Sequence, residues 1–309
     1  MRIVIAGGAG LVGQNLIVRL KQRGHADLVV LDKHRSNLEI LRMQHPDLLC
    51  IEADLAEPGT WSDHLRGAEV VVMLQAQIGG IDQKQFQRNN VDSARHLLDA
   101  SALHGVRYLV HVSSSVVESV ANDWYTDSKK AQEQMVAECT LPHVILRPTL
   151  MFGWFDRKHL GWLARFMNRT PVFPIPGHGR YQRQPLYVGD FCNILMSCIE
   201  GKVVAGTWNI SGLEQVDYID IIRQIKGAIR SRTLILPIPY WLFHALLAIW
   251  ALFDPDPPFT TQQLSALVAD DEFEVIDWPE IFSVTPTPFS KAIDETFNDA
   301  RYGHVVLKF

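Results

Sequence analysis

The chain opens with the segment Met1-Arg2-Ile3-Val4-Ile5-Ala6-Gly7-Gly8-Ala9-Gly10-Leu11-Val12-Gly13. Its short apolar run predicts a buried parallel strand, and the glycines follow at once. Apolar residues then recur at helical spacing up to Leu20, and Gly24 suits the end of that helix. This order of strand, glycine turn and helix predicts a phosphate-binding turn. Glycine lets the backbone approach a pyrophosphate, and the helix N-terminus offers free N–H groups.

An acidic residue stands where the second predicted strand ends. Residues 28–31 form that strand, and Asp32 follows it, 19 residues after Gly13. An acid at this place accepts hydrogen bonds from both ribose hydroxyls of NAD. We therefore predict NAD in preference to NADP, although the basic run Lys33, His34 and Arg35 could tolerate a 2′-phosphate.

Tyr125 and Lys129 lie four residues apart, and Tyr125 comes ten residues after the end of the triple serine Ser113-Ser114-Ser115. Positions i and i+4 share a helix face, and an ammonium beside a phenol favours the phenolate. A free tyrosine has a pKa of about 10, so a lowered pKa would make Tyr125 a general base for an alcohol proton. This spacing is also common on solvated helix faces. The glycine turn and Asp32 favour the catalytic interpretation of the Tyr125–Lys129 pair, because they predict a bound dinucleotide.

Further short motifs follow in order along the chain: Asp54-Leu55, Asn90-Val91, Leu146-Arg147-Pro148 with Gly153, Arg183 with Val188-Gly189-Asp190, and Trp208-Asn209-Ile210-Ser211-Gly212. With the glycine turn and the Tyr-Lys pair, they resemble the extended short-chain dehydrogenase/reductase family. The resemblance is to its nucleotide-sugar epimerase/dehydratase branch, and it runs from Met1 to about Gly212.

The resemblance implies roles for particular residues. Tyr125 would remove the alcohol proton, Lys129 would lower the tyrosine pKa and hold the nicotinamide ribose, and Ser115 or Ser114 would hydrogen-bond the reacting oxygen. The implied substrate contacts come from Arg183, Arg180 and Gln77. The residues implied to bind the cofactor are Gly7, Gly10, Leu11, Val12, Gly13, Asp32, Lys33, Asp54, Leu55, Gln75, Ala76, Asn90, Ser113, Lys129 and Pro148.

The chain also departs from the family pattern. Met73-Leu74-Gln75-Ala76 stands where members often carry His-Leu-Ala-Ala, and the loop between the serines and Tyr125 is short. Sugar-nucleotide dehydratases place Asp-Glu directly after the catalytic hydroxyl. Here Val116 and Val117 follow Ser115, and neither side chain can move a proton. Dehydration by that mechanism is therefore disfavoured.

Strand and helix patterns alternate along the sequence. We predict strands at 2–6, 28–31, 48–51, 69–74, 107–112, 143–146 and 207–211, and helices at 11–22, 36–44, 84–104, 124–139, 158–168, 190–200 and 217–230. The alternation predicts an α/β fold, a doubly wound parallel (Rossmann) sheet with a smaller, discontinuous α+β C-terminal substrate domain. Residues 1–148 should form the dinucleotide-binding domain, with parts of 186–212 returning to it, and 149–309 mainly the substrate domain. In the family, helices 84–104 and 124–139 often pair with a second subunit, which predicts a homodimer.

Composition narrows the function further. The 309 residues carry a net charge of −5, which gives no general attraction to nucleic acid. The four cysteines show neither metal spacing nor a disulfide framework, so we expect no metal site and a reducing, cytoplasmic compartment. The glycines that interrupt the first apolar stretch argue against a signal peptide.

Residues 170–190 are predicted to form a loop whose residue types suit ligand binding. Prolines stiffen it, and glycines let it approach a ligand. Arg180 and Arg183 could grip a diphosphate as planar forks, and Tyr181 or Phe173 could stack on a base. The alternative is a surface loop with two solvated arginines.

Residues 234–253 are almost entirely apolar. A membrane span needs about 20 such residues without interruption. Pro237 and Pro239 leave a helical part at 240–253 of about 21 Å, at 1.5 Å per residue, which is too short to span. Three interpretations stay open: a buried or lid helix over the substrate, a helix seated in the membrane interface, and an oligomer contact. The second would give the protein a peripheral membrane contact.

These observations predict an NAD-dependent epimerase or oxidoreductase acting on a secondary alcohol of a nucleotide-sugar. If hydride returns before NADH leaves, the outcome is epimerisation; otherwise it is dehydrogenation. One alternative is a dehydrogenase or isomerase of a lipid-like alcohol, such as a steroid or isoprenoid, suggested by residues 234–253 and the short loop. Another is a non-catalytic NAD(P)-binding subunit of a larger assembly, against which the intact Ser-Tyr-Lys set argues.

Overall fold

The apolar runs predicted as strands form one seven-stranded parallel sheet in the order β11-β6-β5-β4-β1-β2-β3. The computed structural model describes residues 1–80, 82–119, 123–201, 203–253, 264, 267–268 and 274–308. The strands are β1 (Ile3–Ala6), β2 (Leu28–Asp32), β3 (Leu49–Glu52), β4 (Val70–Met73), β5 (Tyr108–Val112), β6 (His143–Pro148) and β11 (Gly206–Ile210). The predicted doubly wound parallel sheet is confirmed.

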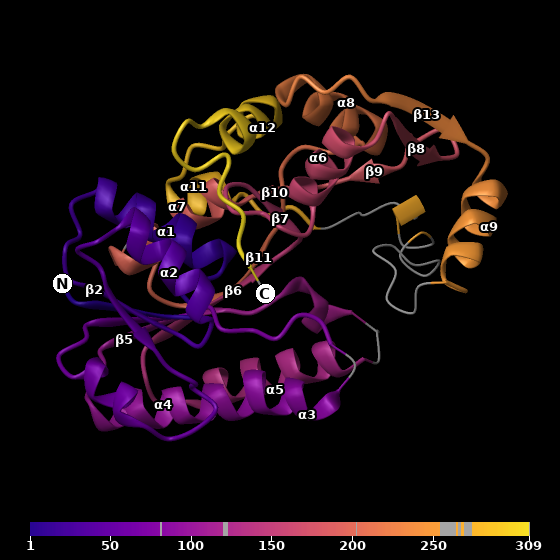
Figure 1. Ribbon diagram of the computed structural model, residues 1–309. Coiled ribbons are helices and arrows are strands. Elements are labelled where there is room, and N and C mark those ends of the chain that lie inside the picture. Colours follow the sequence, from indigo (N-terminus) through magenta and orange to yellow (C-terminus); the bar gives the residue numbers. More distant parts are fainter. Residues whose placement is uncertain are drawn as a thin grey trace.

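Alternate residues of each strand enter two separate cores, as the two-residue period of a strand requires. Ile3 and Ile5 pack on the side of α1 (Leu11–Gln22), α2 (Arg35–Gln44) and α7 (Val188–Ile199). Val4 and Ala6 pack on the opposite side, against α4 (Ser93–Leu103) and α5 (Trp124–Glu138). Figure 1 shows the α4 and α5 layer below the sheet and the α1, α2 and α7 layer above it.

The helix predicted at 84–104 is continuous from Gln83 to Leu103, but it is not α-helical throughout. A short α3 (Gln83–Phe86) leads into a π-helix (Gln87–Asp92), and α4 begins only at Ser93. A π-turn inserts an extra residue and shifts the following face of the helix, and such turns are frequent at functional sites. Here the turn carries Asn90, whose side chain is fully buried.

The C-terminal lobe is built on small sheets. Residues 170–190, predicted as a loop, contain β8 (Val172–Pro176), β9 (Gln182–Arg183) and β10 (Leu186–Tyr187). Each strand has a partner outside this segment, in β13 (Leu234–Ile238), β12 (Val216–Asp217) and β7 (Met151–Phe152) respectively. Local sequence gives no sign of these pairings, so the loop prediction was wrong. The helices are α6 (Leu160–Arg169), α8 (Tyr218–Ala228), α9 (Tyr240–Trp250), α11 (Trp278–Phe282) and α12 (Phe289–Asn298).

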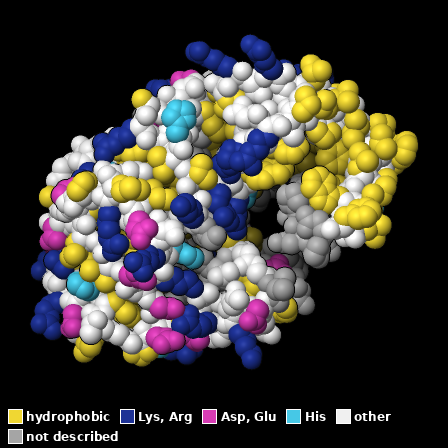
Figure 2. Space-filling view, in the orientation of Figure 1, with side chains coloured by type: hydrophobic (Ala, Val, Ile, Leu, Met, Phe, Trp, Pro, Cys, Tyr) yellow, Lys and Arg dark blue, Asp and Glu magenta, His cyan; other side chains and the backbone are white. Residues whose placement is uncertain are grey.

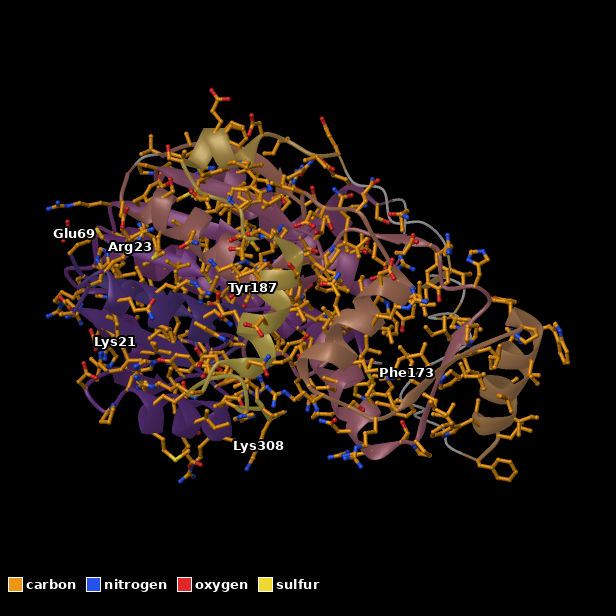
Figure 3. The ribbon with its side chains drawn as sticks, turned by 90° about the horizontal axis from the view of Figure 1, so that it is seen from above. Lys21, Arg23, Glu69, Phe173, Tyr187 and Lys308 are labelled. Atoms are coloured by element: carbon orange, nitrogen blue, oxygen red, sulfur yellow. The ribbon has the colours of Figure 1, made fainter. Side chains whose placement is uncertain are left out.

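A buried arginine joins the two lobes. Arg19 of α1 donates hydrogen bonds to the Tyr187 hydroxyl (3.2 Å) and to Glu295 of α12 (3.2 Å). Its guanidinium also lies 4.6 Å from the ring centroid of Trp154. Figure 3 places Tyr187 near the middle of the molecule, with Phe173 toward the side of α9. One cation therefore satisfies acceptors from both parts of the chain.

The apolar segment 234–253 forms β13 and α9 at the edge of the molecule (Figure 1). No residue of α9 is buried, so its interpretation as a buried helix was wrong. Among the described residues, no helix combines the length and apolar character that crossing a bilayer requires.

Candidate active site

The residues proposed to bind the cofactor gather where the parallel strands end. Carboxyl ends of such strands share one edge of the sheet, the usual ligand position in doubly wound folds. Residues at or directly after the strand ends are Gly7 after β1, Asp32 and Lys33 at the end of β2, Asp54 after β3, Gln75 and Ala76 after β4, Ser113 after β5 and Pro148 at the end of β6.

The glycine turn fits a pyrophosphate. Gly7 has a φ of 75°, and a Cβ there would lie 2.6 Å from the backbone nitrogen of Gln75, so the turn passes close to the end of β4. Gly10 is the N-cap of α1, without a side-chain cap and with no acidic residue in the first turn. The first N–H groups of α1, at Leu11, Val12 and Gly13, therefore stay available to an anion.

Asp32 is bound to this turn. Its carboxylate accepts hydrogen bonds from the backbone N–H of Ala9 (2.9 Å) and of His34 (2.9 Å). Burial raises the pKa of Asp32, while these two hydrogen bonds act in the opposite direction. Lys33, beside it, donates to Asn89 (2.7 Å).

The π-helix holds the loop after β4. Asn90 accepts from the Gln77 backbone N–H (2.6 Å) and donates to the Gln77 carbonyl (3.1 Å) and the Ser128 hydroxyl (2.8 Å). Arg88 on the same turn donates to Asp54 (2.7 Å) and lowers the pKa of that carboxyl. The Asn90 side chain thus joins the loop after β4 to α5. Sequence gave no sign of Arg88.

Ser114 is the serine that reaches Tyr125: the two side chains form a hydrogen bond. Ser115 instead begins a 3₁₀ turn (Ser115–Glu118). Burial raises the pKa of Tyr125, and the bond from Ser114 opposes that rise without cancelling it. Besides burial, the neighbours that act on the pKa of Tyr125 are Ser114, which lowers it, and Asp123, which raises it.

Lys129 lies one helical turn after Tyr125 and is almost completely buried. Its ammonium donates to the Val112 carbonyl (3.1 Å) and to the side chain of Gln132. Burial lowers the pKa of Lys129 to about 7. Lys129 in turn helps to hold the pKa of the fully buried His111 well below its usual range.

The predicted substrate residues lie in the C-terminal lobe or facing it. Arg180 is exposed, and the Arg183 guanidinium lies 5.7 Å from the ring centroid of Tyr181. Tyr181 is buried and stacks on Tyr218, with centroids 5.3 Å apart, and Phe173 is buried as well. The idea that either ring stacks on a base was therefore wrong. Gln77, on the loop after β4, accepts from Asn89 (3.0 Å).

Sequence reasoning missed the ion pairs beside the Tyr-Lys helix. Arg147 at the end of β6 binds Glu133 of α5 and Glu118 of the 3₁₀ turn after the serines. Asn209 of β11 donates to the same Glu118 (3.0 Å). This network fixes α5 against the serine turn. The Arg-Pro motif marked Arg147 but not its partners.

A parallel sheet with a glycine turn and a Ser–Tyr pair at its carboxyl edge defines an NAD-dependent enzyme of the extended short-chain dehydrogenase/reductase type. The model of the NAD dependent epimerase/dehydratase family matches residues 3–211. The chain therefore belongs to the NAD-dependent epimerase/dehydratase family.

Relatives within this family differ in what they act on. Ceramide reductase of Caulobacter vibrioides is 28% identical over 178 residues, 56% of this chain and 53% of that protein, so the match spans about half of its length. The low-salt glycan biosynthesis protein Agl12 of Haloferax volcanii is 24% identical, over 74% of this chain and 83% of that protein. UDP-glucuronic acid 4-epimerase of Bacillus cereus, solved with NAD, aligns with a TM-score of 0.75 and 19% identity, covering 96% and 97% of the chains. At this identity, the structural match shows the fold.

Proposed function

We propose that the enzyme transfers hydride between NAD and a secondary alcohol, or the matching ketone, of a nucleotide-sugar. The observation that carries this proposal is the hydrogen bond between the side chains of Ser114 and Tyr125, one helical turn before the buried Lys129. Two hydroxyls side by side can hold a single substrate oxygen, and one of them can exchange a proton with it.

The raised pKa of Tyr125 decides its resting form. Because burial favours the neutral phenol, Tyr125 donates its proton to the oxygen of a ketone substrate. In the opposite direction, Tyr125 must be in its phenolate form, which accepts the alcohol proton. The bound cofactor would supply the redox chemistry, with NADH as hydride donor to a ketone carbon and NAD⁺ as hydride acceptor from an alcohol carbon.

Lys129 has a positioning task. An ammonium has three N–H donors, and among the described residues the Val112 carbonyl and Gln132 account for two of them. We assign the third to the nicotinamide ribose. The Gly7 turn and the first N–H groups of α1 would hold the pyrophosphate, and Asp32 the adenosine ribose.

The nucleotide-sugar assignment draws on charge. Between Asp156 and Asp190 the chain has no acidic residue, and the cations there are Arg157, Lys158, Arg165, Arg169, Arg180 and Arg183. Arg180 and Arg183 suit a diphosphate. UDP alone should raise the melting temperature of the wild type and should lose this effect in an Arg180→Gln, Arg183→Gln double variant.

Changing Tyr125→Phe tests the chemistry. The variant lacks only the phenolic oxygen, so turnover should fall by roughly 100- to 10,000-fold, the usual contribution of a positioned proton donor. NAD affinity, measured by fluorescence titration, should stay within about twofold of the wild type, since the contacts to the cofactor are kept. Wild-type turnover in this variant would refute the mechanism.

A lipid-like alcohol or ketone is the second candidate substrate. The exposed apolar surface of β13 and α9 favours it, as does the similarity to ceramide reductase. Turnover of a long-chain ketone with NADH, and no thermal shift with UDP, would favour this candidate over the nucleotide-sugar. The Tyr125→Phe result is expected to be the same for both substrates.

A further inference from the structure

One exposed apolar surface contains none of the residues proposed for hydride transfer or cofactor binding. Residues 234–253 are twenty consecutive residues without a charged side chain. Leu234 and Leu236 alternate along β13 and so share its exposed face, and Leu252 and Phe253 after α9 are 80% and 84% exposed. The β13–α9 face comprises Val172, Leu234, Leu236, Trp241, Leu246, Ile249, Trp250, Leu252 and Phe253. It forms the broad hydrophobic area at the right of Figure 2.

Helix α9 is apolar around its whole circumference. A helix that docks on a protein usually has one apolar stripe and a polar back. In α9 every residue is exposed or half-buried, and polar atoms occur only on Tyr240, His244 and the two tryptophans. Hydrocarbon suits such a helix better than a single protein groove, because it can contact several sides at once.

The tryptophans and the length of α9 indicate how it would lie. Trp241 and Trp250 stand near the two ends of the helix, and indoles prefer the boundary between headgroups and acyl chains. Eleven helical residues extend about 16 Å, roughly half the hydrocarbon thickness of a bilayer. The helix can therefore lie along one leaflet.

Basic residues accompany this face. No acidic residue occurs in 157–189 or in 221–253, although the whole chain carries a net charge of −5. Arg169 precedes β8, while Arg230 and Arg232 precede β13, and the parallel pairing of Val172 with Leu234 brings all three to one end of the strand pair. All three are exposed, and the described residues offer none of them a carboxylate partner. Figure 2 shows basic side chains at the border of the apolar area.

We propose that the β13–α9 face docks the enzyme on an anionic lipid bilayer. The apolar side chains enter one leaflet, with α9 at the boundary between headgroups and acyl chains, and Arg169, Arg230 and Arg232 contact the anionic headgroups. The docking requires no particular substrate, so it stands or falls independently of the proposed function.

Vesicle flotation of the full chain tests the docking. The wild type should float with phosphatidylcholine vesicles that contain phosphatidylglycerol, and more weakly with phosphatidylcholine alone. A Leu246→Glu, Leu252→Glu double variant should lose at least about tenfold in vesicle partition, because two exposed apolar side chains no longer enter the lipid. An Arg230→Gln, Arg232→Gln variant should lose roughly fivefold per arginine with anionic vesicles only.

Met43→Glu is the matched control, because it places the same charge on a 75% exposed apolar residue of α2. It should float like the wild type, and all variants should keep the wild-type melting temperature. Failure of the wild type to float would overturn the proposal, as would an equal loss in Met43→Glu. A lipid-free dimer that the Leu246→Glu, Leu252→Glu variant dissociates would instead assign the face to a second copy of the chain.

Discussion

Ser114 and Ser115 are both hydroxyl residues near Tyr125, and the sequence analysis favoured Ser115 with Ser114 as the alternative. The structure gives the contact with the phenol to Ser114, while Ser115 starts the 3₁₀ turn. Ser114→Ala should therefore reduce kcat by on the order of 100-fold, as the loss of a hydrogen-bond donor to a reacting oxygen does. Ser115→Ala should stay within about twofold in the same steady-state assay. The opposite order would assign the catalytic hydroxyl to Ser115.

Lys129 couples stability to pH. Its pKa of about 7 in the folded protein lies below the ordinary lysine value of 10.5, so the unfolded chain binds the extra proton between these values. Stability consequently rises with pH across this window. Lys129→Met should remove that rise, which amounts to about 1–2 kcal/mol between pH 7 and 8.5.

Urea unfolding of the wild type and Lys129→Met at these two pH values measures the difference. Lys130→Met is the control, since its exposed ammonium should leave the pH dependence unchanged. The variant comparison also removes contributions common to both proteins, such as the cysteines whose pKa burial raises. An equal slope in Lys129→Met would show that Lys129 is not the titrating group.

The strands of the large sheet were predictable because each is a short apolar run bounded by polar or turn residues. β1 (Ile3–Ala6), for example, lies within the strand predicted at 2–6. Pairings across long stretches of chain were not predictable. β8 joins β13 about sixty residues later, and no local pattern marks a partner at that distance. The π-turn at Asn90 was not predicted for a similar reason. Its buried hydrogen bonds join Asn90 to Gln77 and Ser128, which are distant in the sequence.

Substitutions at two glycines test how closely the turn between β1 and α1 approaches the end of β4. Gly7 and Gly24 both have positive φ values, of 75° and 85°, but a Cβ at Gly24 meets nothing within 4 Å. Gly24→Ala should therefore cost only the backbone strain, about 1–2 kcal/mol. Gly7→Ala should cost clearly more, about 3 kcal/mol or above, because its Cβ meets the Gln75 backbone. Equal losses in urea unfolding would disprove the close approach.

The positions of the proposed catalytic and cofactor-binding residues were easier to predict from sequence than their charge states or the substrate contacts. The backbone position of each residue follows closely from its place in the sequence. Gly7 follows β1, Asp32 ends β2, and Tyr125 shares α5 with Lys129. Charge states were not predictable, because burial raises the pKa of Tyr125 and lowers that of Lys129, and both effects come from the packed fold. Substrate contacts depend on the C-terminal lobe, which is the part that local sequence describes least well.

The predicted homodimer would use α4 and α5, which lie below the sheet in Figure 1, whereas α9 lies at the far right edge of the molecule. Leu103, at the end of α4, is 78% exposed and continues an exposed stripe with Arg95 and Asp99. Sedimentation equilibrium without lipid should give twice the chain mass of 35.0 kDa. Leu103→Glu should raise the dimer dissociation constant about tenfold or more, because a charge replaces a buried apolar contact.

The α4–α5 surface and the β13–α9 face can be told apart in that same experiment. The Leu246→Glu, Leu252→Glu variant should keep the wild-type dimer, because its changes lie on the β13–α9 face. Met43→Glu should also keep it. The dimer could instead persist in Leu103→Glu and dissociate in the Leu246→Glu, Leu252→Glu variant. That result would place the subunit contact at α9 and not at the α4–α5 surface. A monomer at every concentration would rule out the homodimer altogether, while leaving lipid docking through α9 intact.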